Sequence, residues 1–302
     1  MQKRDLLSVT DLSKHEVNSL LQRAAELKVS KDVPLSGRSI ALMFEKPSLR
    51  TRSSFEVGVF QLGGQCIYLG PTEIAMGQRE PVSDIAQVAE GYFDAIIARV
   101  YKHETLEELA SHANVPIVNA LSDWEHPCQV LSDALTVSEN CQSLEGQQMT
   151  YIGDGDNNIT RSLALLMPSL GVNLVICSPD SHQLDDESVQ AARSRAQFGA
   201  SVKLEGDPSE AAQGADFIYT DIWASMGKEA EREARRVAFR GFSVTPELIA
   251  KAKPTCKLMH DLPASHGDEI AVGMFEHESS IVFPQAHNRL HMQKALLDFL
   301  LP

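Results

Sequence analysis

The feature that most constrains this chain is a repeated alternation of short apolar runs with stretches of helical periodicity. Apolar runs occupy residues 38–44 (RSIALMF), 65–69, 94–100 and 116–120, and helical patterns separate them. Such short, continuous runs are typical of strands buried in a parallel sheet. Strands that alternate with helices are joined by right-handed crossovers, so we predict an α/β fold. Ser13 and Glu16 have the form of a capping box, which predicts a helix over 13–28, and residues 70–80 are predicted to be a loop.

The pattern restarts near Cys141, which indicates a second domain. Further strands are predicted at 148–152, 173–177, 201–204, 216–220 and 257–260, and further helices at 157–170, 245–252 and 288–301. A length of 302 residues suits about two domains. We predict two doubly wound parallel-sheet domains, residues 1–140 and 141–284, with an interdomain cleft facing the carboxyl ends of the strands. The charged stretch 228–240 is predicted to be a solvated helix or a mobile loop.

The charge balance and the cysteines limit which partners and which cellular compartment the sequence is compatible with. A formal net charge of −14 disfavours nucleic acid and anionic membranes, which both require a basic face. An anionic substrate would therefore need a local basic pocket. The five cysteines are widely spaced without a C-x-x-C pair, and the first residues, MQKRDLLSVTDL, lack the apolar core of a signal peptide. We predict a soluble cytoplasmic protein with reduced thiols and no zinc site.

The polar tract after the first apolar run is the strongest local signal of a binding site. Pro47 ends the strand, Ser48, Arg50 and Thr51 follow, and apolar helical spacing resumes at Phe55. A helix N-terminus presents unpaired N–H groups and a partial positive charge, and a guanidinium group adds a planar fork for phosphate oxygens. We therefore predict a phosphate or carboxylate site here. The alternative is an exposed helix cap with two surface arginines.

Other polar residues lie where predicted strands end. Arg99 lies at the end of the strand 94–100 and suits a phosphate or a carbonyl oxygen; the alternative is a salt bridge on the rim. His126 and Gln129 lie about one turn apart at a corner between a strand and a helix. They suit an uncharged C(=O)NH2 group, because imidazole donates to its oxygen and carboxamide accepts from its nitrogen. A plain helix start is the alternative for this pair.

The second half of the chain offers acidic residues at the corresponding corners. Residues 153–158 (GDGDNN) lack the G-x-G-x-x-G spacing, and their two carboxylates would repel a pyrophosphate, so this turn suits a cationic amine. A nucleotide-binding oxidoreductase is the alternative, because a strand, a glycine turn and a helix follow one another here. Asp221 and Ser225 come after another strand, and Asp261 comes after a third.

Seven motifs give the chain a resemblance to a known family. SLRTR, Arg99, HPCQ, GDGDNN, DIWASMG, HDLP and NRLH occur in the order seen in the aspartate/ornithine carbamoyltransferase family, and DIWASMG resembles its ornithine-type members. The resemblance implies a two-domain α/β fold, with the C-terminal helix 285–302 packing back on the first domain, and a homotrimer or a multiple of trimers. It also implies transfer of the carbamoyl group from carbamoyl phosphate to the δ-amine of L-ornithine. The products would be L-citrulline and phosphate, as in arginine biosynthesis, without a metal or an organic cofactor.

The resemblance further implies which residues contact each substrate. Carbamoyl phosphate would be held by Ser48, the backbone N–H of Leu49, Arg50, Thr51, Arg99, His126, Gln129 and Arg289. L-Ornithine would be held by Asn158, Asp221, Ser225 and Met226, with Asp221 pairing its α-ammonium group. The residues implied to be catalytic are Arg50, Arg99, His126, Asp261 and Arg289. Positioning and charge stabilisation would carry the reaction.

Three positions depart from the family pattern. Leu49 stands where threonine is usual, Ala75 where many members have a glutamine that reaches a neighbouring subunit, and Asp261 where cysteine is usual. A carboxylate at 261 would hold the δ-ammonium group and raise its pKa, so our hypothesis is an active enzyme with an alkaline-shifted pH profile. The departures leave open a carbamoyltransferase for another amine, such as putrescine or an acylated ornithine. They also leave open a non-catalytic relative that binds carbamoyl phosphate.

Overall fold

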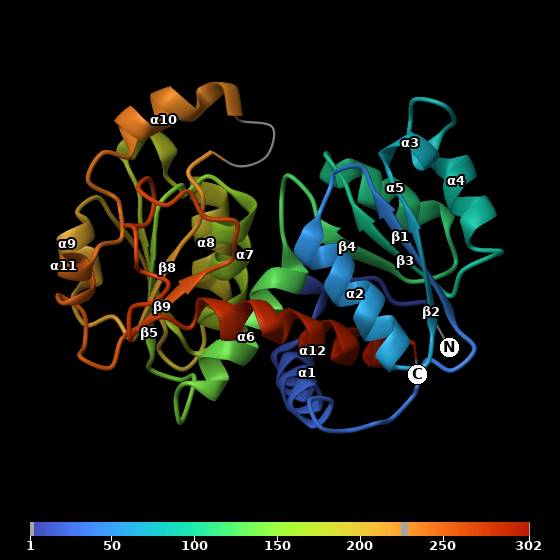
Figure 1. Ribbon diagram of the computed structural model, residues 1–302, viewed down its shortest axis with the longest axis horizontal. Helices are drawn as coiled ribbons and strands as arrows, with labels where there is room; N and C mark the ends of the chain where they lie inside the picture. The colour runs from blue at the N-terminus through green and yellow to red at the C-terminus, as the bar shows by residue number, and fades with distance from the viewer. Residues whose placement is uncertain (1–2, 225–228, 302) are drawn as a thin grey trace. The chain divides into compact units, whose positions relative to one another are not determined.

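The computed structural model of the protein describes residues 3–224 and 229–301. The chain divides into two compact units, and each contains one sheet. Unit 1 comprises residues 1–135 and 287–302, and unit 2 comprises residues 136–286. Every strand pair in both sheets is parallel, which confirms the predicted α/β class (Figure 1).

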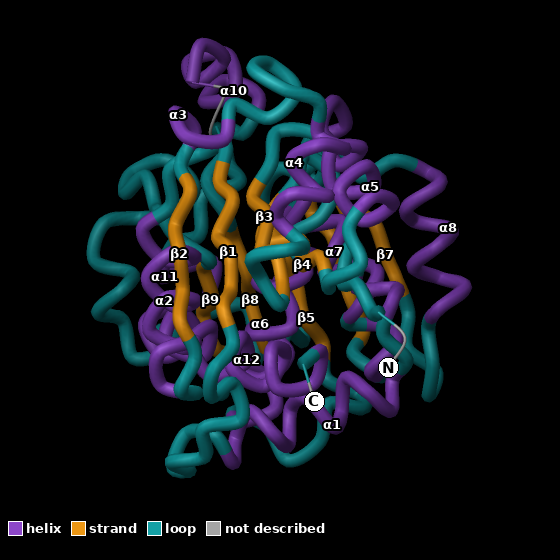
Figure 2. Tube along the Cα trace, turned by 90° about the vertical axis from the view of Figure 1, so that its right-hand side faces the viewer, coloured by secondary structure: helices purple, strands orange, loops and turns teal. Residues whose placement is uncertain are grey.

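Unit 1 is built on a four-stranded sheet. Its strands are β1 (Ser39–Phe44), β2 (Gln65–Leu69), β3 (Ala95–Arg99) and β4 (Ile117–Leu121), in the order β2-β1-β3-β4 (Figure 2). The central strands β1 and β3 are buried along nearly their whole length, as expected for a parallel sheet covered on both faces. The edge strand β2 is partly exposed. All four strands match the predicted apolar runs closely.

Helices cover the sheet of unit 1. In chain order they are η1 (Val9–Asp11), α1 (Lys14–Glu26), α2 (Leu49–Gln61), α3 (Pro71–Ile74), α4 (Val82–Ala89), α5 (His103–His112) and α6 (Pro127–Glu139), of which α6 continues into unit 2. The predicted capping box starts α1, because Glu16 Oε2 accepts from the Ser13 N–H at 2.8 Å and Ser13 Oγ accepts from the Glu16 N–H. Val82 of α4 and Leu106 of α5 pack with Ile96 in one apolar cluster.

Unit 2 contains a five-stranded sheet in the order β7-β6-β5-β8-β9. Its strands are β5 (Gln148–Ile152), β6 (Asn173–Cys177), β7 (Val202–Glu205), β8 (Phe217–Thr220) and β9 (Lys257–His260). Its further helices are α7 (Asn158–Leu166), η2 (Pro168–Leu170), η3 (Asp180–His182), α8 (Asp186–Arg195), α9 (Pro208–Ala212), η4 (Glu229–Glu231), α10 (Arg232–Ala238) and α11 (Pro246–Ile249). Because β5, β8 and β9 are neighbours, the segments that follow them meet at one edge of the sheet.

The last helix, α12 (Val282–Leu300), begins before the predicted start at residue 288. Pro284 lies in its first turn, where the missing N–H has no intrahelical partner to lose. Asp298 accepts from Nε of Arg23 in α1 at 2.7 Å, and Nζ of Lys294 donates to the Leu27 carbonyl at 2.6 Å. The C-terminal part of α12 therefore packs on unit 1, as the resemblance implied.

Four segments differ from the sequence-based expectation. The predicted loop 70–80 contains the one-turn helix α3. The helices α8 and α9 were not predicted, and α8 has only Val189 and Ala192 as buried apolar residues, too few for a clear periodicity. The stretch 228–240 contains the helix α10, but Arg235 within it is only 6% exposed, so the expectation of a solvated helix is wrong at that position. Among the described residues, every helix is too short or too polar to span a membrane.

Candidate active site

The first group of predicted site residues lies where α2 begins. Ser48 is the N-cap of this helix, with an extended backbone, and its Oγ accepts a hydrogen bond from the Thr51 N–H at 3.2 Å. Leu49 and Arg50 form the first turn, whose N–H groups have no partners within the helix and suit an anion. The Leu49 side chain is 77% exposed, so the backbone is what this residue contributes. The polar tract thus forms the strand-to-helix turn that its sequence predicts.

A contact between distant parts of the chain adds a second arginine to this helix end. Arg289 of α12 donates from Nη2 to Oγ1 of Thr51 at 2.7 Å, across a separation of 238 residues. Both side chains are buried. The hydroxyl group fixes the orientation of the guanidinium group, whose planar fork matches phosphate and carboxylate oxygens.

The positive charges of three arginines affect the protonation of His126. It immediately precedes α6, and its side chain is buried. Burial lowers the pKa of His126 well below its ordinary value, and the charges of Arg289, Arg99 and Arg50 lower it further. The imidazole is therefore neutral at neutral pH, with one N–H donor. We call Ser48, Arg50, Thr51, Arg99, His126, Gln129 and Arg289 the basic cluster.

Gln129 follows His126 by about one turn of α6 and is buried. Its Nε2 donates to Oδ1 of Asp133 at 2.9 Å, which orients the carboxamide. Over residues 3–224 and 229–301, the structure gives the buried Oε1 of Gln129 no hydrogen-bond partner. A buried acceptor without a donor is unfavourable. The NH2 group of a ligand would supply that donor, in agreement with the role predicted for Gln129.

Lys46 is a cation that the sequence reasoning left unassigned. It lies between β1 and α2, is buried, and places its Nζ 4.7 Å from the centre of the Tyr101 ring. Burial lowers the pKa of Lys46, and the charge of Arg99 lowers it further. The effect of the Arg99 charge on this pKa places Lys46 beside the basic cluster. Its position within KPSLRTR, close to the arginines in sequence, could have indicated that Lys46 belongs to the same site.

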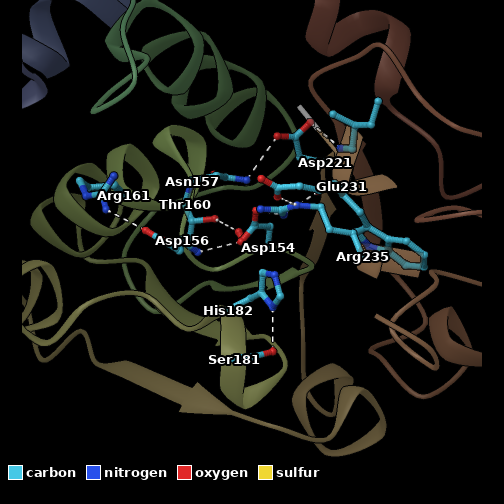
Figure 3. A network of polar contacts seen from close by, with 12 residues as sticks. Asp154, Asp156, Asn157, Thr160, Arg161, Ser181, His182, Asp221, Glu231 and Arg235 are labelled. Carbon is cyan, nitrogen blue, oxygen red and sulfur yellow. Dashed lines mark hydrogen bonds and ion pairs between the residues drawn. The ribbon is translucent and has the colours of Figure 1, made fainter. Parts of the chain in front are cut away.

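The second group of predicted residues includes Asp221 and Asp261, which follow β8 and β9 in unit 2, and Figure 3 shows Asp221 beside Asn157. Asp221 follows β8 and is buried; its Oδ1 accepts from the Ile222 N–H at 2.6 Å, and its Oδ2 accepts from Nδ2 of Asn157 at 3.4 Å. Asn157 is the N-cap of α7, where its Oδ1 accepts from the Thr160 N–H at 2.8 Å. Asn158, the predicted ligand, is the first residue of α7. Asn157 is thus a neighbour of Asp221 that the sequence reasoning missed.

The segment after β9 is shaped by His260, which is fully buried. Its Nδ1 accepts from the Leu262 N–H at 2.9 Å, and its Nε2 lies 3.4 Å from Oε1 of Glu269. Leu262 has a φ of 62°, which is uncommon for a residue other than glycine. This turn places Asp261 beside Asp221, to which it is hydrogen bonded.

Asp221 and Asp261 form a pair of neighbouring carboxyl groups. One side-chain atom of each, together with one of His260, lies within 4.8 Å of the others, a spacing that a metal ion also requires. However, Nδ1 of His260 accepts from the backbone and Nε2 faces Glu269, so an ammonium group fits better because it needs only acceptors. Burial raises the pKa of Asp221, while the bond to Asp261 and the nearby His260 oppose the rise. We call Asp221, His260, Asp261 and Glu269 the acidic cluster.

The structure therefore brings most of the predicted site residues together within each unit. In unit 1 the basic cluster joins α2, the end of β3, the start of α6 and α12. In unit 2 the acidic cluster joins Asp221 and Asp261, and Asn158 lies in the adjoining turn. The predicted residues Ser225 and Met226 lie outside the described residues.

A unit whose basic cluster suits an anion and a unit whose acidic cluster suits an amine fit the class of group-transfer enzymes that join an anionic donor to an amine. The sequence matches the model of the "Aspartate/ornithine carbamoyltransferase, carbamoyl-P binding domain" over residues 4–139. It matches the model of the "Aspartate/ornithine carbamoyltransferase, Asp/Orn binding domain" over residues 145–300. Together the two matches cover both units.

Individual proteins agree with these matches. The ornithine carbamoyltransferase of Bacillus subtilis (strain 168) is 44% identical over 300 residues, covering 99% of this chain and 94% of the relative. The structure of ornithine carbamoyltransferase from Pyrococcus furiosus has a TM-score of 0.95 at 41% identity, covering 98% of this chain and 96% of that one. The anabolic enzyme from Campylobacter jejuni has a TM-score of 0.93 at 35% identity, covering 99% of each chain. The chain belongs to the aspartate/ornithine carbamoyltransferase family, which confirms the resemblance seen in its motifs.

Proposed function

We propose that the protein transfers the carbamoyl group from carbamoyl phosphate to the δ-amine of L-ornithine, giving L-citrulline and phosphate. The observation that carries this proposal is that Arg50, Arg99 and Arg289 lie near one buried imidazole, His126. Their charges, together with burial, lower its pKa and keep it neutral. A doubly charged phosphate is matched by the guanidinium groups, and an uncharged carbamoyl group is matched by neutral His126. In a chain with a net charge of −14, such a site is built for a specific anion.

The basic cluster would hold the donor. Ser48, Arg50, Thr51 and the Leu49 N–H would bind the phosphate at the start of α2, with Arg99 adding a further fork. His126 would donate to the carbamoyl oxygen, and Oε1 of Gln129 would accept from the carbamoyl nitrogen. Arg289, held by Thr51, would lie near the carbamoyl group.

The acidic cluster would hold the acceptor. Asp221 would pair the α-ammonium group of ornithine, with Asn158, Ser225 and Met226 completing the contacts. Asp261 would lie at the δ-amine, where a carboxylate holds the ammonium form. The supporting observation is that buried Asp221 and half-buried Asp261 are neighbours, since adjacent carboxyl groups removed from water call for a cationic partner.

The reaction would form a C–N bond at the carbonyl carbon and break the C–O bond to phosphate. The neutral δ-amine attacks the carbonyl carbon, and the proton that the amine loses passes to the leaving phosphate. Arg50, Arg99 and His126 would stabilise the oxygen of the tetrahedral intermediate and the leaving phosphate, and loss of one such donor typically costs about 10²-fold or more in rate.

We further propose the assignment of domains, assembly and setting. Residues 1–140 with 285–302 would form the carbamoyl-phosphate domain, and 141–284 the ornithine domain. A homotrimer, or a multiple of trimers, would form through unit 1, where α2 and the edge strand β2 expose large apolar side chains such as Phe60 (78%) and Ile67 (38%). A cytoplasmic role in arginine biosynthesis is supported by the five free cysteines and by the similarity to the anabolic ornithine carbamoyltransferase from Campylobacter jejuni.

The test is citrulline formation by the purified protein from carbamoyl phosphate and a panel of amines across pH. L-Ornithine is expected to be the preferred acceptor over putrescine and acylated ornithine. Preference for one of those amines would overturn the acceptor assignment, because Asp261 borders the amine. Binding of carbamoyl phosphate without any citrulline would instead identify a non-catalytic relative.

A further inference from the structure

A buried arginine in unit 2 links the two segments that carry the acceptor residues, although it lies in neither. Arg235 of α10 donates from Nη1 to Oδ2 of Asp154 at 2.5 Å and to the carbonyl oxygen of Trp223 at 2.8 Å (Figure 3). Its Nε donates to Oε2 of Glu231 at 2.9 Å. One guanidinium group therefore contacts the turn after β5 and the segment after β8.

Burial distinguishes Arg235 from the arginine beside it. The side chain of Arg235 is 7% exposed and that of its partner Asp154 is 3% exposed, whereas the side chain of Arg236 is 50% exposed. Removing two charges from water is costly, and the attraction between them often does no more than offset that cost. Stability is therefore a weak explanation for this pair. The groups that it joins offer a better one.

The Asp154 side of the link fixes the turn that leads into α7. Oδ1 of Asp154 accepts from the Asp156 N–H at 3.1 Å, and its backbone carbonyl accepts from Oγ1 of Thr160 at 2.8 Å. The turn is thus tied to the first turn of α7, which begins with Asn158. Asn157, within the same turn, reaches Asp221. Displacement of Asp154 would move these asparagines together.

The Trp223 side of the link fixes the segment that carries Asp221. Arg235 holds the carbonyl of Trp223, and Phe239, the C-cap of α10, stacks on its ring with centroids 5.4 Å apart and an interplanar angle of 17°. Both contacts come from one short helix. They hold the backbone two residues beyond Asp221, so α10 controls where that carboxylate lies.

We propose that Arg235 is a positioning residue for the acceptor, which sets the placement of Asn158 relative to Asp221 by tying together the segments after β5 and β8. The inference rests on the proposed function, because those two residues matter only if an amine binds there. Among the described residues, the hydrogen bonds of the Arg235 side chain run to Asp154, Trp223 and Glu231. Its effect should therefore appear as weaker binding of the amine, with the donor unaffected.

The test compares Arg235→Gln with Arg236→Gln, a matched loss of one arginine at the next position. Arg235→Gln is expected to raise the KM for ornithine about 10- to 100-fold, the order expected from small misplacement of binding groups, and to leave the KM for carbamoyl phosphate within about twofold. Arg236→Gln, whose exposed side chain pairs with Asp268 at 2.8 Å, should change neither value. An unchanged ornithine KM in Arg235→Gln, or equal rises for both substrates, would overturn the proposal.

A second variant covers the case in which Arg235→Gln does not fold. Arg235→Lys keeps the charge but loses the fork that reaches Asp154 and Trp223 together, so it should show a smaller rise confined to ornithine. A normal ornithine KM in this variant would contradict the proposal. A wild-type protein that carbamoylates no amine would overturn the proposed function and the Arg235 role together. An active wild type with unaltered variants would overturn the Arg235 role alone.

Discussion

The basic and acidic clusters show that burial has opposite consequences at two sites of one molecule. At His126, burial and three neighbouring arginines act in the same direction, so the pKa falls and the imidazole stays neutral. At Asp221, burial raises the pKa, whereas the hydrogen bond to Asp261 and the nearby His260 act against it. The state of the basic cluster is therefore insensitive to pH near neutrality. In the acidic cluster, the raised pKa of Asp221 means that its carboxylate loses its charge at a higher pH than an ordinary aspartate does.

The largest effect on activity is expected when one cation is removed from the basic cluster. Arg50→Ala is expected to lower kcat/KM by about 10²-fold or more, because the phosphate and the developing charge lose a donor. Turnover of citrulline measures the effect. Arg52→Ala is the matched control: Arg52 lies over the Tyr68 ring and pairs with Glu56 at 2.9 Å on the same helix. Near-normal citrulline formation by Arg50→Ala would refute the assignment of the donor site.

The next largest effect is expected from the acidic cluster. Asp221→Asn should raise the KM for ornithine about 10- to 100-fold and leave that for carbamoyl phosphate nearly unchanged, because the α-ammonium group loses its charge partner. Steady-state kinetics with each substrate varied in turn separate the two values. Asp156→Asn, a change of an exposed carboxylate in the neighbouring turn, is the control. A rise shared by both substrates would show that the two clusters do not have separate ligands.

The pH profile sharpens the comparison further. Because the pKa of Asp221 is raised, its carboxylate is lost as pH falls through that raised value, so the ornithine KM should rise on acidification while the carbamoyl phosphate KM stays level. Asp261→Cys should shift the rate profile to lower pH by about one unit, since a carboxylate at the δ-amine favours the ammonium form. Initial rates across pH test both statements. An unchanged profile in Asp261→Cys would count against the role given to Asp261.

The smallest expected effect concerns stability. The pKa of His126 is lower in the folded protein than in the unfolded chain, so the unfolded state binds the extra proton first. Stability should therefore fall as pH drops below about 6.5, by at most about 1.4 kcal/mol per pH unit from this group, until the lowered pKa is reached. Denaturant unfolding of wild type and His126→Asn at several pH values measures the difference. His15→Asn, on the exposed face of α1, is the control, and identical slopes in all three proteins would contradict the prediction.

Local signals in the sequence carried much of the fold and part of the site. The apolar runs predicted the strands, and the polar tract after Pro47 predicted a helix start, which the structure places at Leu49. Such signals are local because caps and turns depend on adjacent residues. The bond from Arg289 to Thr51 spans 238 residues, and only the resemblance pointed to Arg289. Nothing in the sequence indicated that Arg235 is buried, since a charged stretch is ordinarily solvated. Contacts of this kind depend on tertiary packing, which periodicity does not encode.

The hydrogen bond between Arg289 and Thr51 also bears on how the protein is made. Residues 48 to 51 leave the ribosome early, but their guanidinium partner on α12 is translated near the opposite end of the sequence. A nascent chain therefore completes the basic cluster only after α12 has been synthesised. Ribosome-tethered fragments ending before residue 287 would lack this contact.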